Sequence, residues 1–209
     1  MDPDDARTAE IMWNPKYKNR IAVYDYYFPV IQLVGLSQGI TPAQITVANL
    51  ESKIRQPLLR LKANTQVVGD IVTVLNALYG ESVDMIVGGA EWSVALDMVD
   101  NKSLDYTVFD EGALLWNESL SIFVDSKNYD ACWKFIDWVM SPEGQRYLAT
   151  SECFWGNPVR KDTPLTEEEA KILRWDQQVA ILDNSHPSTI GAPDLDTAML
   201  DLWQEFLAS

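Results

Sequence analysis

The sequence predicts an α/β protein with a largely parallel sheet flanked by helices. Two observations carry this prediction. Short apolar runs alternate with segments of helical periodicity through the first half of the chain, which is the pattern of an α/β layer. The composition is also that of a globular protein, because 47% of the 209 residues are hydrophobic and 22% are charged, enough to bury a sizeable core.

The first elements follow one another as strand, helix, strand and helix. The run IAVYD predicts a strand over 21–25, and apolar spacing predicts a helix over 28–39 that stops at Gly39. A longer amphipathic helix is expected over 46–64, where Pro57 should kink it or split it in two. A further strand and helix are then expected over 65–70 and 71–80.

The next stretch is expected to be mostly strand. Residues 83–92 indicate a buried strand that runs into a Gly-Gly turn, and a short helix should follow over 93–101. Alternation of apolar and polar residues predicts a strand over 104–110. The run LLWNESLSIFV predicts a long strand over 114–124.

The rest of the chain is predicted to be helical. Helices are expected over 128–140, over 141–151 with Ser141 as cap, over 166–173 with a Thr166–Glu169 capping box, and over 193–209. These apolar helix faces are numerous for the one sheet that the first half supplies. Some of them are therefore expected to pack on a second sheet that this chain does not fully encode.

The charge of the chain limits its partners. A net charge of −15 argues against nucleic acid and against an anionic membrane surface, whose phosphates would be repelled. The charge is compatible with a cationic ligand, although acidic surfaces also serve solubility alone. Eight Trp and eight Tyr make a site for a sugar, an amine or a heterocycle easier to build. The acidic start, MDPDDARTAE, is not a secretory signal, so the chain is either cytoplasmic or a piece of something longer.

Cysteine and histidine are too few to predict a metal site, and no cofactor is expected. The chain has Cys132, Cys153 and one histidine, His186, without any CxxC or His/Cys cluster. Cys132 lies at helical spacing with apolar neighbours, which predicts a core position. A Cys132–Cys153 disulfide in an oxidising compartment and a Cys–His nucleophile pair both remain open at this point.

Trp116 and Glu118 form the pair that first suggests a binding site. On a strand, side chains two residues apart point to the same face. A carboxylate on a face otherwise occupied by large apolar groups either reaches water at the end of the strand or meets a cation. From spacing alone, a core Trp beside a surface Glu is the simpler interpretation.

Several longer segments resemble the solute-binding proteins of bacterial polyamine (spermidine/putrescine) ABC transporters. They are MWNPKYKNRIAVYD, ESVDMIVGGAEW, DEGALLWNESLSIF and NYDACWKFIDWVMSPEGQRYLA. The resemblance covers nearly the whole chain but only the second half to two-thirds of that family. It implies a periplasmic or extracellular receptor of the type II periplasmic-binding-protein fold, with permease partners and without enzymatic activity. Its two lobes would close on the ligand by hinge bending. Residues 13–116 would form the second lobe, 117–160 would return to the first, and 161–209 would be a C-terminal helical segment.

The resemblance also implies which residues contact the ligand. The family has a Trp and an Asp at the positions of Trp116 and Glu118, and both contact the ligand there. Trp155 stands where the family often has a ligand-contacting Tyr. Glu91 and Trp92 lie in the turn where the family places a stacking Trp, although the gapless match falls on Gly89 instead.

The residues after the first strand, Asp25 and Tyr26, occupy the place of the family's ligand carboxylates. One of those positions falls on Tyr26 and another on Pro29, which leaves Asp25 as the only acid nearby. Fewer carboxylates suit a ligand with fewer charges. We therefore expect putrescine, a monoamine or an amino-acid-like molecule rather than spermidine.

Other functions remain as alternatives. The adjacent phenols of Tyr26 and Tyr27 with a carboxylate would suit a ferric ion. A hydrolase could use Asp25 or Glu118 as general acid and base, but the chain has no GxSxG, phosphate-loop or metal motif. A half-receptor that binds no ligand is the remaining alternative.

Overall fold

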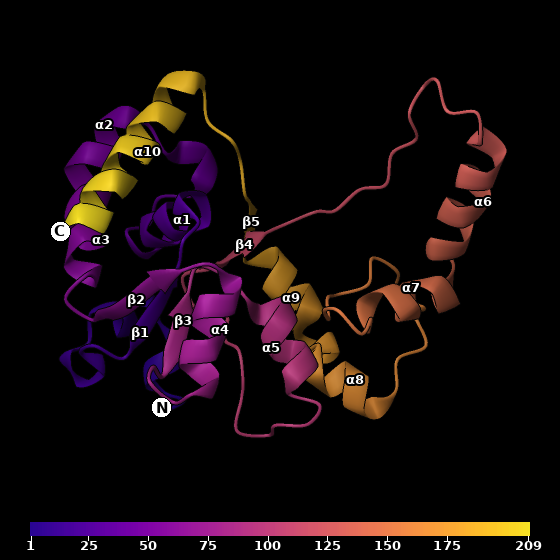
Figure 1. The fold of residues 1–209 in the computed structure, drawn as a ribbon, viewed down its shortest axis with the longest axis horizontal. Helices are drawn as coiled ribbons and strands as arrows, with labels where there is room; N and C mark the ends of the chain where they lie inside the picture. The colour runs from indigo at the N-terminus through magenta and orange to yellow at the C-terminus, as the bar shows by residue number, and fades with distance from the viewer. The chain divides into compact units, whose positions relative to one another are not determined.

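The computed structural model describes residues 1–209, and these fall into two compact units. Unit 1 comprises Met1–Ala90, Thr107–Trp116 and Ala180–Ser209, and unit 2 comprises Glu91–Tyr106 and Asn117–Val179. Unit 1 contains the sheet and its helices, whereas unit 2 is made of helices joined by long irregular segments (Figure 1). Each unit is described by itself below.

Unit 1 is built on a three-stranded parallel sheet in the order β2-β1-β3. The strands are β1 (Ile21–Tyr24), β2 (Thr65–Gly69) and β3 (Met85–Val87), so the predicted strands are confirmed with small changes at their ends. Ile21 and Val23 of β1 point into one core while Ala22 points into another. Both faces of β1 are therefore covered, as its unbroken apolar run predicts.

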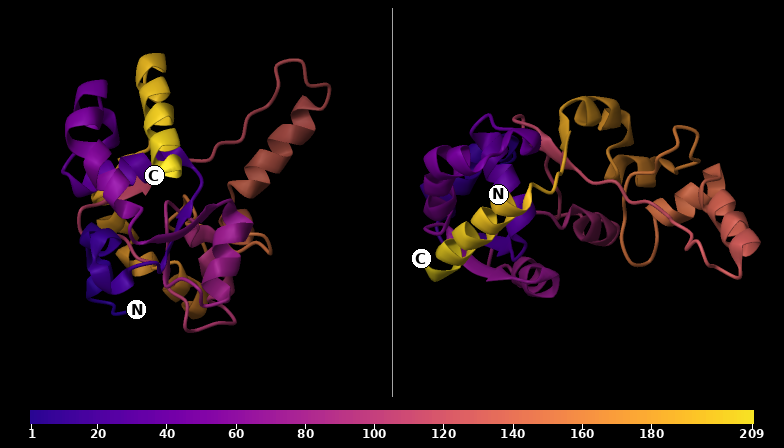
Figure 2. Two further views of the ribbon diagram at one scale, coloured as in Figure 1. Left: turned by 60° about the vertical axis from the view of Figure 1, so that its left-hand side comes forward. Right: turned by 90° about the horizontal axis from the view of Figure 1, so that it is seen from above.

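Helices cover both faces of this sheet (Figures 1 and 2). On one face lie α1 (Tyr27–Ser37), α3 (Arg55–Leu61) and α10 (Pro193–Ala208), whose apolar residues share one core with Ile21 and Val23. On the other face lies α4 (Ile71–Tyr79), whose Val74 packs with Ala22. The smaller α2 (Val47–Asn49) and the 3₁₀ turn η4 (Pro42–Gln44) connect α1 to α3.

The helix predicted over 46–64 is split, as Pro57 requires. A π-helical stretch, η5 (Leu50–Ile54), separates α2 from α3. Pro57 has no N–H and cannot bond to the carbonyl four residues earlier, so a wider turn just before it absorbs the mismatch. The apolar positions Leu50, Ile54 and Leu58 nevertheless stay buried, which keeps one face of this segment on the core.

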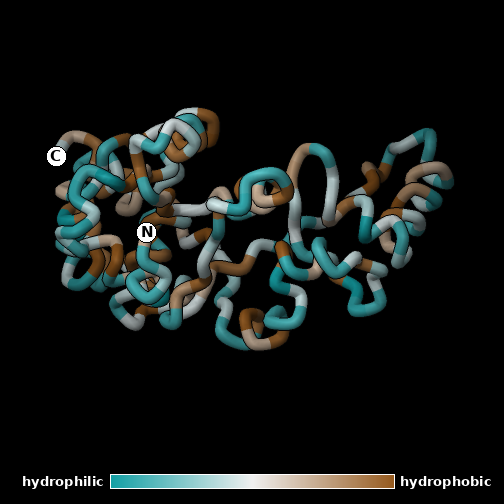
Figure 3. Tube along the Cα trace, turned by 90° about the horizontal axis from the view of Figure 1, so that it is seen from below, coloured by the Kyte–Doolittle hydropathy of each residue, from teal (hydrophilic) through white to brown (hydrophobic).

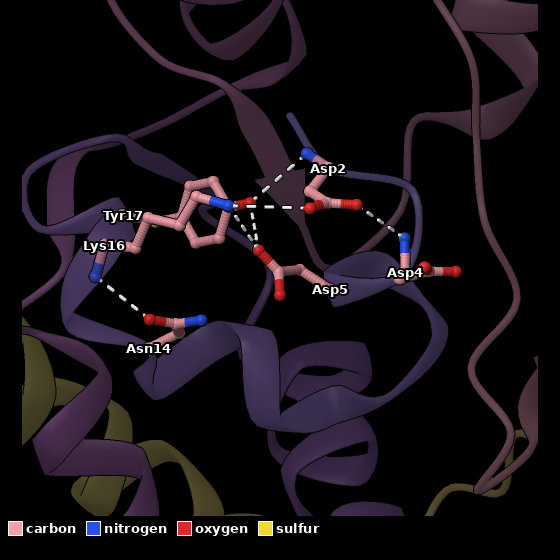
Figure 4. A network of polar contacts seen from close by, with 6 residues as sticks. All are labelled: Asp2, Asp4, Asp5, Asn14, Lys16 and Tyr17. Carbon is pink, nitrogen blue, oxygen red and sulfur yellow. Dashed lines mark hydrogen bonds and ion pairs between the residues drawn. The ribbon is translucent and has the colours of Figure 1, made fainter.

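The first seventeen residues form three short 3₁₀ helices, η1 (Asp5–Arg7), η2 (Ala9–Trp13) and η3 (Pro15–Tyr17). A polar network joins η1 to η3 (Figure 4). The Asp5 carboxylate accepts hydrogen bonds from Lys16 Nζ at 2.8 Å and from the Tyr17 hydroxyl at 2.7 Å. These contacts lower the pKa of Asp5 and raise that of Lys16.

A second sheet in unit 1 consists of β4 (Ala113–Leu115) and β5 (Ser185–Pro187), which pair in parallel. The long strand predicted over 114–124 is therefore wrong, because only its first residues belong to a strand. The strand predicted over 104–110 is also wrong, and these residues have no regular structure. Alternation of polar and apolar residues makes a strand only where a neighbouring strand accepts its hydrogen bonds.

Unit 2 contains α5 (Glu91–Asp97), α6 (Tyr129–Val139), α7 (Pro142–Ala149) and α8 (Glu167–Ile172). After them come η6 (Trp175–Gln177) and the start of α9 (Gln178–Asp183), whose last residues belong to unit 1. The predicted caps of α7 and α8 are confirmed. Ser141 accepts from Gly144 N–H, and Thr166 and Glu169 form the capping box. The Arg146 guanidinium, paired with Glu169 at 2.8 Å, ties α7 to α8 and lowers the pKa of Glu169.

One part of unit 2 exposes many apolar side chains, and these are together named the α6 face here. Along the extended segment before α6, Phe123 and Val124 are 89% and 92% exposed, and Phe135 on the helix is 58% exposed. Figure 3 shows hydrophobic residues in this part of the chain, at the right of the view, as well as in the sheet-bearing part. The α6 face consists of Leu120, Phe123, Val124, Trp133, Phe135 and Trp138, all exposed.

The predicted core position of Cys132 is wrong, because the residue is only half-buried beneath the α6 face. Cys132 lines a hollow of about 380 Å³ that lies between residues 120–122 and α6. Cys153 is exposed, and both thiols are free, so the structure does not contain the disulfide that the sequence left open. The sequence predicts more apolar helix faces than one sheet can cover. In the structure, the helix α6 leaves large apolar side chains exposed.

Candidate functional site

The carboxyl ends of the three parallel strands of unit 1 form the edge where a ligand site is expected in an α/β sheet. Asp25 follows β1, Asp70 follows β2, and Gly88 and Gly89 follow β3. The Asp25 N–H donates to the Gly69 carbonyl at 2.7 Å, which holds the ends of β1 and β2 together. Gly88 has φ +106, and a Cβ there would lie 2.6 Å from Val30, so only glycine lets β3 end this close to α1.

Five aromatic rings gather at this edge and are here named the aromatic cluster. Tyr26 is stacked on Trp116 with ring centroids 6.2 Å apart and an interplanar angle of 27°. Phe28 meets the edge of Trp116 at 6.4 Å. Trp116 remains 52% exposed and Tyr26 41% exposed, so both rings offer a face to solvent. The aromatic cluster consists of Tyr24, Tyr26, Tyr27, Phe28 and Trp116.

A short anchored segment carries Trp116 to this cluster. Both carboxylate oxygens of Glu111 accept the Ala9 N–H at 3.1 Å, which ties the segment to the start of η2. Gly112 then adopts φ +116, and a Cβ on it would lie 2.7 Å from the carbonyl oxygen of Asn184. After it, β4 pairs with β5 up to Leu115. Glu111 and Gly112 of the segment DEGALLWNESLSIF therefore have a structural role, because they position the chain that carries Trp116.

Asp25 lies beside the aromatic cluster, and one of its oxygens is occupied. The indole Nε1–H of Trp203 donates to Asp25 Oδ1 at 2.9 Å. The residue is otherwise exposed to solvent, and it immediately precedes Tyr26 of the cluster in the sequence. Neither Trp203 nor this contact was predicted from the sequence, because 178 residues separate the two partners.

Tyr27 is held by a second contact from the same helix. Its hydroxyl donates to Asp196 Oδ1 at 2.7 Å. This hydrogen bond, together with desolvation, raises the pKa of Tyr27 to about 12. A phenol kept protonated in this way is a poor ligand for a hard cation, which counts against the ferric-ion alternative at Tyr26 and Tyr27. The structure also contains no group of three or more His, Cys, Asp or Glu side chains that could hold a metal ion.

The raised pKa of Tyr27 predicts a loss of stability at alkaline pH. In the unfolded chain the phenol ionises near 10.0, whereas the folded chain keeps the proton up to about 12. Between these values the unfolded state binds fewer protons, so the free energy of unfolding falls as the pH rises. Thermal unfolding of the wild type and Tyr27→Phe from about pH 9 to about pH 12 checks this.

The phenylalanine variant should decline less over that range than the wild type. A residual decline is expected in both proteins, because desolvation also raises the pKa of Tyr106 to about 12. Identical pH dependence of the two proteins would contradict the assigned role of Tyr27.

The structure does not support the argument that joined Trp116 and Glu118. The strand ends at Leu115, so the side-chain period of two does not relate these residues. Trp116 belongs to unit 1, while Glu118 is exposed in the irregular chain at the start of the second segment of unit 2, Asn117–Val179. Glu118 remains a candidate only through the resemblance of its motif.

The remaining predicted residues lie in unit 2. Glu91 and Trp92 begin α5, where both are exposed. The Trp155 N–H donates to the Trp92 carbonyl at 2.9 Å, and Trp155 also forms a bridge with Thr150. The predicted residues therefore gather in two groups, with Asp25, Tyr26 and Trp116 in unit 1 and Trp92 with Trp155 in unit 2.

Comparisons with known proteins agree with this fold. The spermidine/putrescine ABC transporter substrate-binding protein of Streptococcus pneumoniae is similar, with a TM-score of 0.81 and 20% identity over 97% of this chain. An ABC transporter protein of Clostridium perfringens gives a TM-score of 0.67 and 20% identity over 98% of this chain. The matches cover 62% and 65% of those two chains, so this chain spans about two-thirds of their length or slightly less.

These likenesses confirm the predicted periplasmic-binding-protein type of α/β fold. The comparison with curated proteins found no match. In the structure, no helix has the length and apolar character needed to cross a membrane. Residues 7–174 match the family described as bacterial extracellular solute-binding protein, in agreement with the resemblance seen in the sequence. The chain therefore belongs to the bacterial extracellular solute-binding proteins.

Proposed function

We propose that this chain belongs to the substrate-binding component of an ABC importer and binds a small cationic amine at the carboxyl edge of unit 1. The single observation that carries the proposal is the stacking, at 6.2 Å, of exposed Trp116 on Tyr26, the residue that directly follows the exposed Asp25. Family membership supports the transport role, and the similar Streptococcus protein is described as the substrate-binding protein of a spermidine/putrescine ABC transporter.

The chemistry of this edge suits an ammonium group attached to an apolar chain. A cation over an aromatic face gains about 0.5–1 kcal/mol when exposed and about 2 kcal/mol or more when desolvated. A carboxylate adds a charge-assisted hydrogen bond to the same group. The methylenes of the ligand would lie along the aromatic rings while Asp25 binds the charge.

The number of available carboxylates favours a ligand with few charges. Asp196 is engaged by the Tyr27 hydroxyl, and Asp70 accepts the Thr73 N–H as the cap of α4. Asp25 keeps one oxygen without such a contact. We therefore infer putrescine, a monoamine or an amino-acid-like molecule as the ligand, in preference to spermidine.

The rest of the receptor is also part of the proposal. Residues 13–116 would form its second lobe, residues 117–160 would cross to the first lobe, and 161–209 would be a C-terminal helical segment. The exposed α6 face supports this division, because its apolar side chains need a covering surface. The protein would act in the periplasm or outside the cell and deliver its ligand to permease subunits.

Calorimetric titration of the 209-residue chain with putrescine, spermidine and propylamine tests the ligand class. Near-physiological salt is needed, because the net charge of −15 would attract any amine weakly at low salt. We expect saturable binding of putrescine, and a stabilisation of about 2.7 kcal/mol at 100-fold excess over Kd. Tight binding of spermidine without binding of any singly charged amine would refute the inferred ligand. The absence of any amine binding would instead favour a half-receptor without a ligand.

A further inference from the structure

The C-terminal helix α10 makes two hydrogen bonds to the residues that follow β1. Asp196 accepts the Tyr27 hydroxyl at 2.7 Å, and Trp203 donates to Asp25 at 2.9 Å. Asp196 and Trp203 are seven residues apart, so they lie two turns apart on the same face of the helix. One face of α10 therefore reaches two members of the candidate site, 169 and 178 residues away in sequence.

Trp203 is held rigidly in place. Only 3% of it is exposed, and its ring stacks on Phe206 with centroids 4.8 Å apart. A buried indole needs a partner for its N–H, and here the partner is Asp25 Oδ1. Because the ring is packed in the core, the direction of its N–H fixes the position of one oxygen of the exposed carboxylate.

The helix itself is attached to the rest of unit 1 by polar contacts near its end. Arg55 of α3 forms an ion pair with Glu205, and the Nζ of Lys62 donates to the carbonyls of Phe206 and Leu207, both at 3.2 Å. These contacts leave α10 little freedom to shift along α3. The positions of Asp196 and Trp203 are therefore set by the whole unit rather than by the site.

We propose that Trp203 and Asp196 are positioning residues of the amine site. Trp203 binds one oxygen of Asp25 and leaves the other directed to the ligand. Asp196 holds Tyr27, whose ring meets Tyr26 edge-on at 6.4 Å, and Tyr26 in turn stacks on Trp116. This inference rests on the proposed function. It adds to the proposed site two residues of α10 that act through Asp25 and Tyr27 and do not themselves contact the ligand.

The variant Trp203→Phe tests the proposal because it removes the N–H and keeps an aromatic ring in the core. Trp13→Phe is a matched control, since Trp13 Nε1 donates to the Pro57 carbonyl at 2.8 Å in the same unit, away from the aromatic cluster. Both variants should unfold at similarly lowered temperatures. Titration with putrescine should show a loss of affinity of about tenfold for Trp203→Phe and less than about twofold for Trp13→Phe.

A second pair of variants separates positioning from general damage. Asp25→Asn keeps an acceptor for the indole but removes the charge that binds the amine. In this background Trp203→Phe should cost less than about twofold in putrescine affinity, because there is no carboxylate left to orient. For Asp196, replacement by Ala should weaken binding, whereas Asp201→Ala on the exposed side of the same helix should not.

The outcomes that overturn the proposal are distinct from failure of the proposed function. Equal losses of affinity in Trp203→Phe and Trp13→Phe, or the same loss with and without Asp25, would show that Trp203 acts only through packing. The failure of the wild type to bind any amine would overturn the proposed function and the positioning role together. Loss in Trp203→Phe alone, dependent on Asp25, supports both.

Discussion

Replacing Trp116 by Ala is expected to weaken putrescine binding by about 30-fold, or about 2 kcal/mol, which is the gain of a desolvated cation–π contact. Trp116 is 52% exposed, so its removal takes the proposed ligand surface away without opening a cavity in the core. It also leaves Tyr26 without its stacking partner. Calorimetric titration of wild type and variant measures the effect.

Trp138→Ala provides the matched control for this experiment. Trp138 is also about half exposed and stacked, on Tyr147 at 6.0 Å, but it lies on α6 in unit 2. Its replacement should leave the affinity for putrescine unchanged within about twofold. Equal affinities of wild type and Trp116→Ala would remove the main support for an amine site at this edge.

Replacing Gly112 by Ala is expected to lower the free energy of unfolding by about 3 kcal/mol or more. With φ +116, Gly112 occupies a conformation that costs another residue about 1–3 kcal/mol. A Cβ there would also lie 2.7 Å from the Asn184 carbonyl oxygen, a backbone atom that cannot rotate away. The clash falls where β4 begins to pair with β5, so the segment that presents Trp116 should shift as well.

Gly39→Ala isolates the conformational part of that penalty. Gly39 also has a positive φ, of +70, but nothing lies within 4 Å of the Cβ position. Its replacement should cost only about 1 kcal/mol, so the difference between the variants measures the clash. Chemical denaturation of wild type and both variants gives the three values. A Gly112→Ala effect no larger than that of Gly39→Ala would contradict the prediction.

Local rules were sufficient to predict most of the helices and the central strands. Thr166 with Glu169, Ser141 and Gly39 mark helix ends because a cap satisfies backbone groups from within a few residues. Pro57 predicted a break for an equally local reason, the missing N–H. The strand β1 was also predicted correctly, because an unbroken apolar run is typical of a strand that is buried on both faces.

The incorrect predictions concern segments whose structure depends on a distant partner. Residues 104–110 and 117–124 show the pattern of strands, but no strand of this chain lies beside them to accept their hydrogen bonds. Cys132 shows the spacing of a core residue, but it is only half-buried, and other large apolar side chains of α6 are exposed. The pattern of apolar residues shows which secondary structure a segment is able to form. Whether that structure forms and is buried depends on a neighbouring strand or helix that the pattern does not reveal.

The sequence by itself determined the α/β class and the helix ends, because capping and periodicity act over a few residues, whereas Trp116, Tyr26 and Asp25 became site candidates through the resemblance to a known family. Tertiary structure alone decided that Tyr26 stacks on Trp116 and that Trp203 holds Asp25. Those contacts join residues 90 and 178 positions apart, and hydrogen bonds and ring stacking depend on distances that only the packing of the whole unit sets.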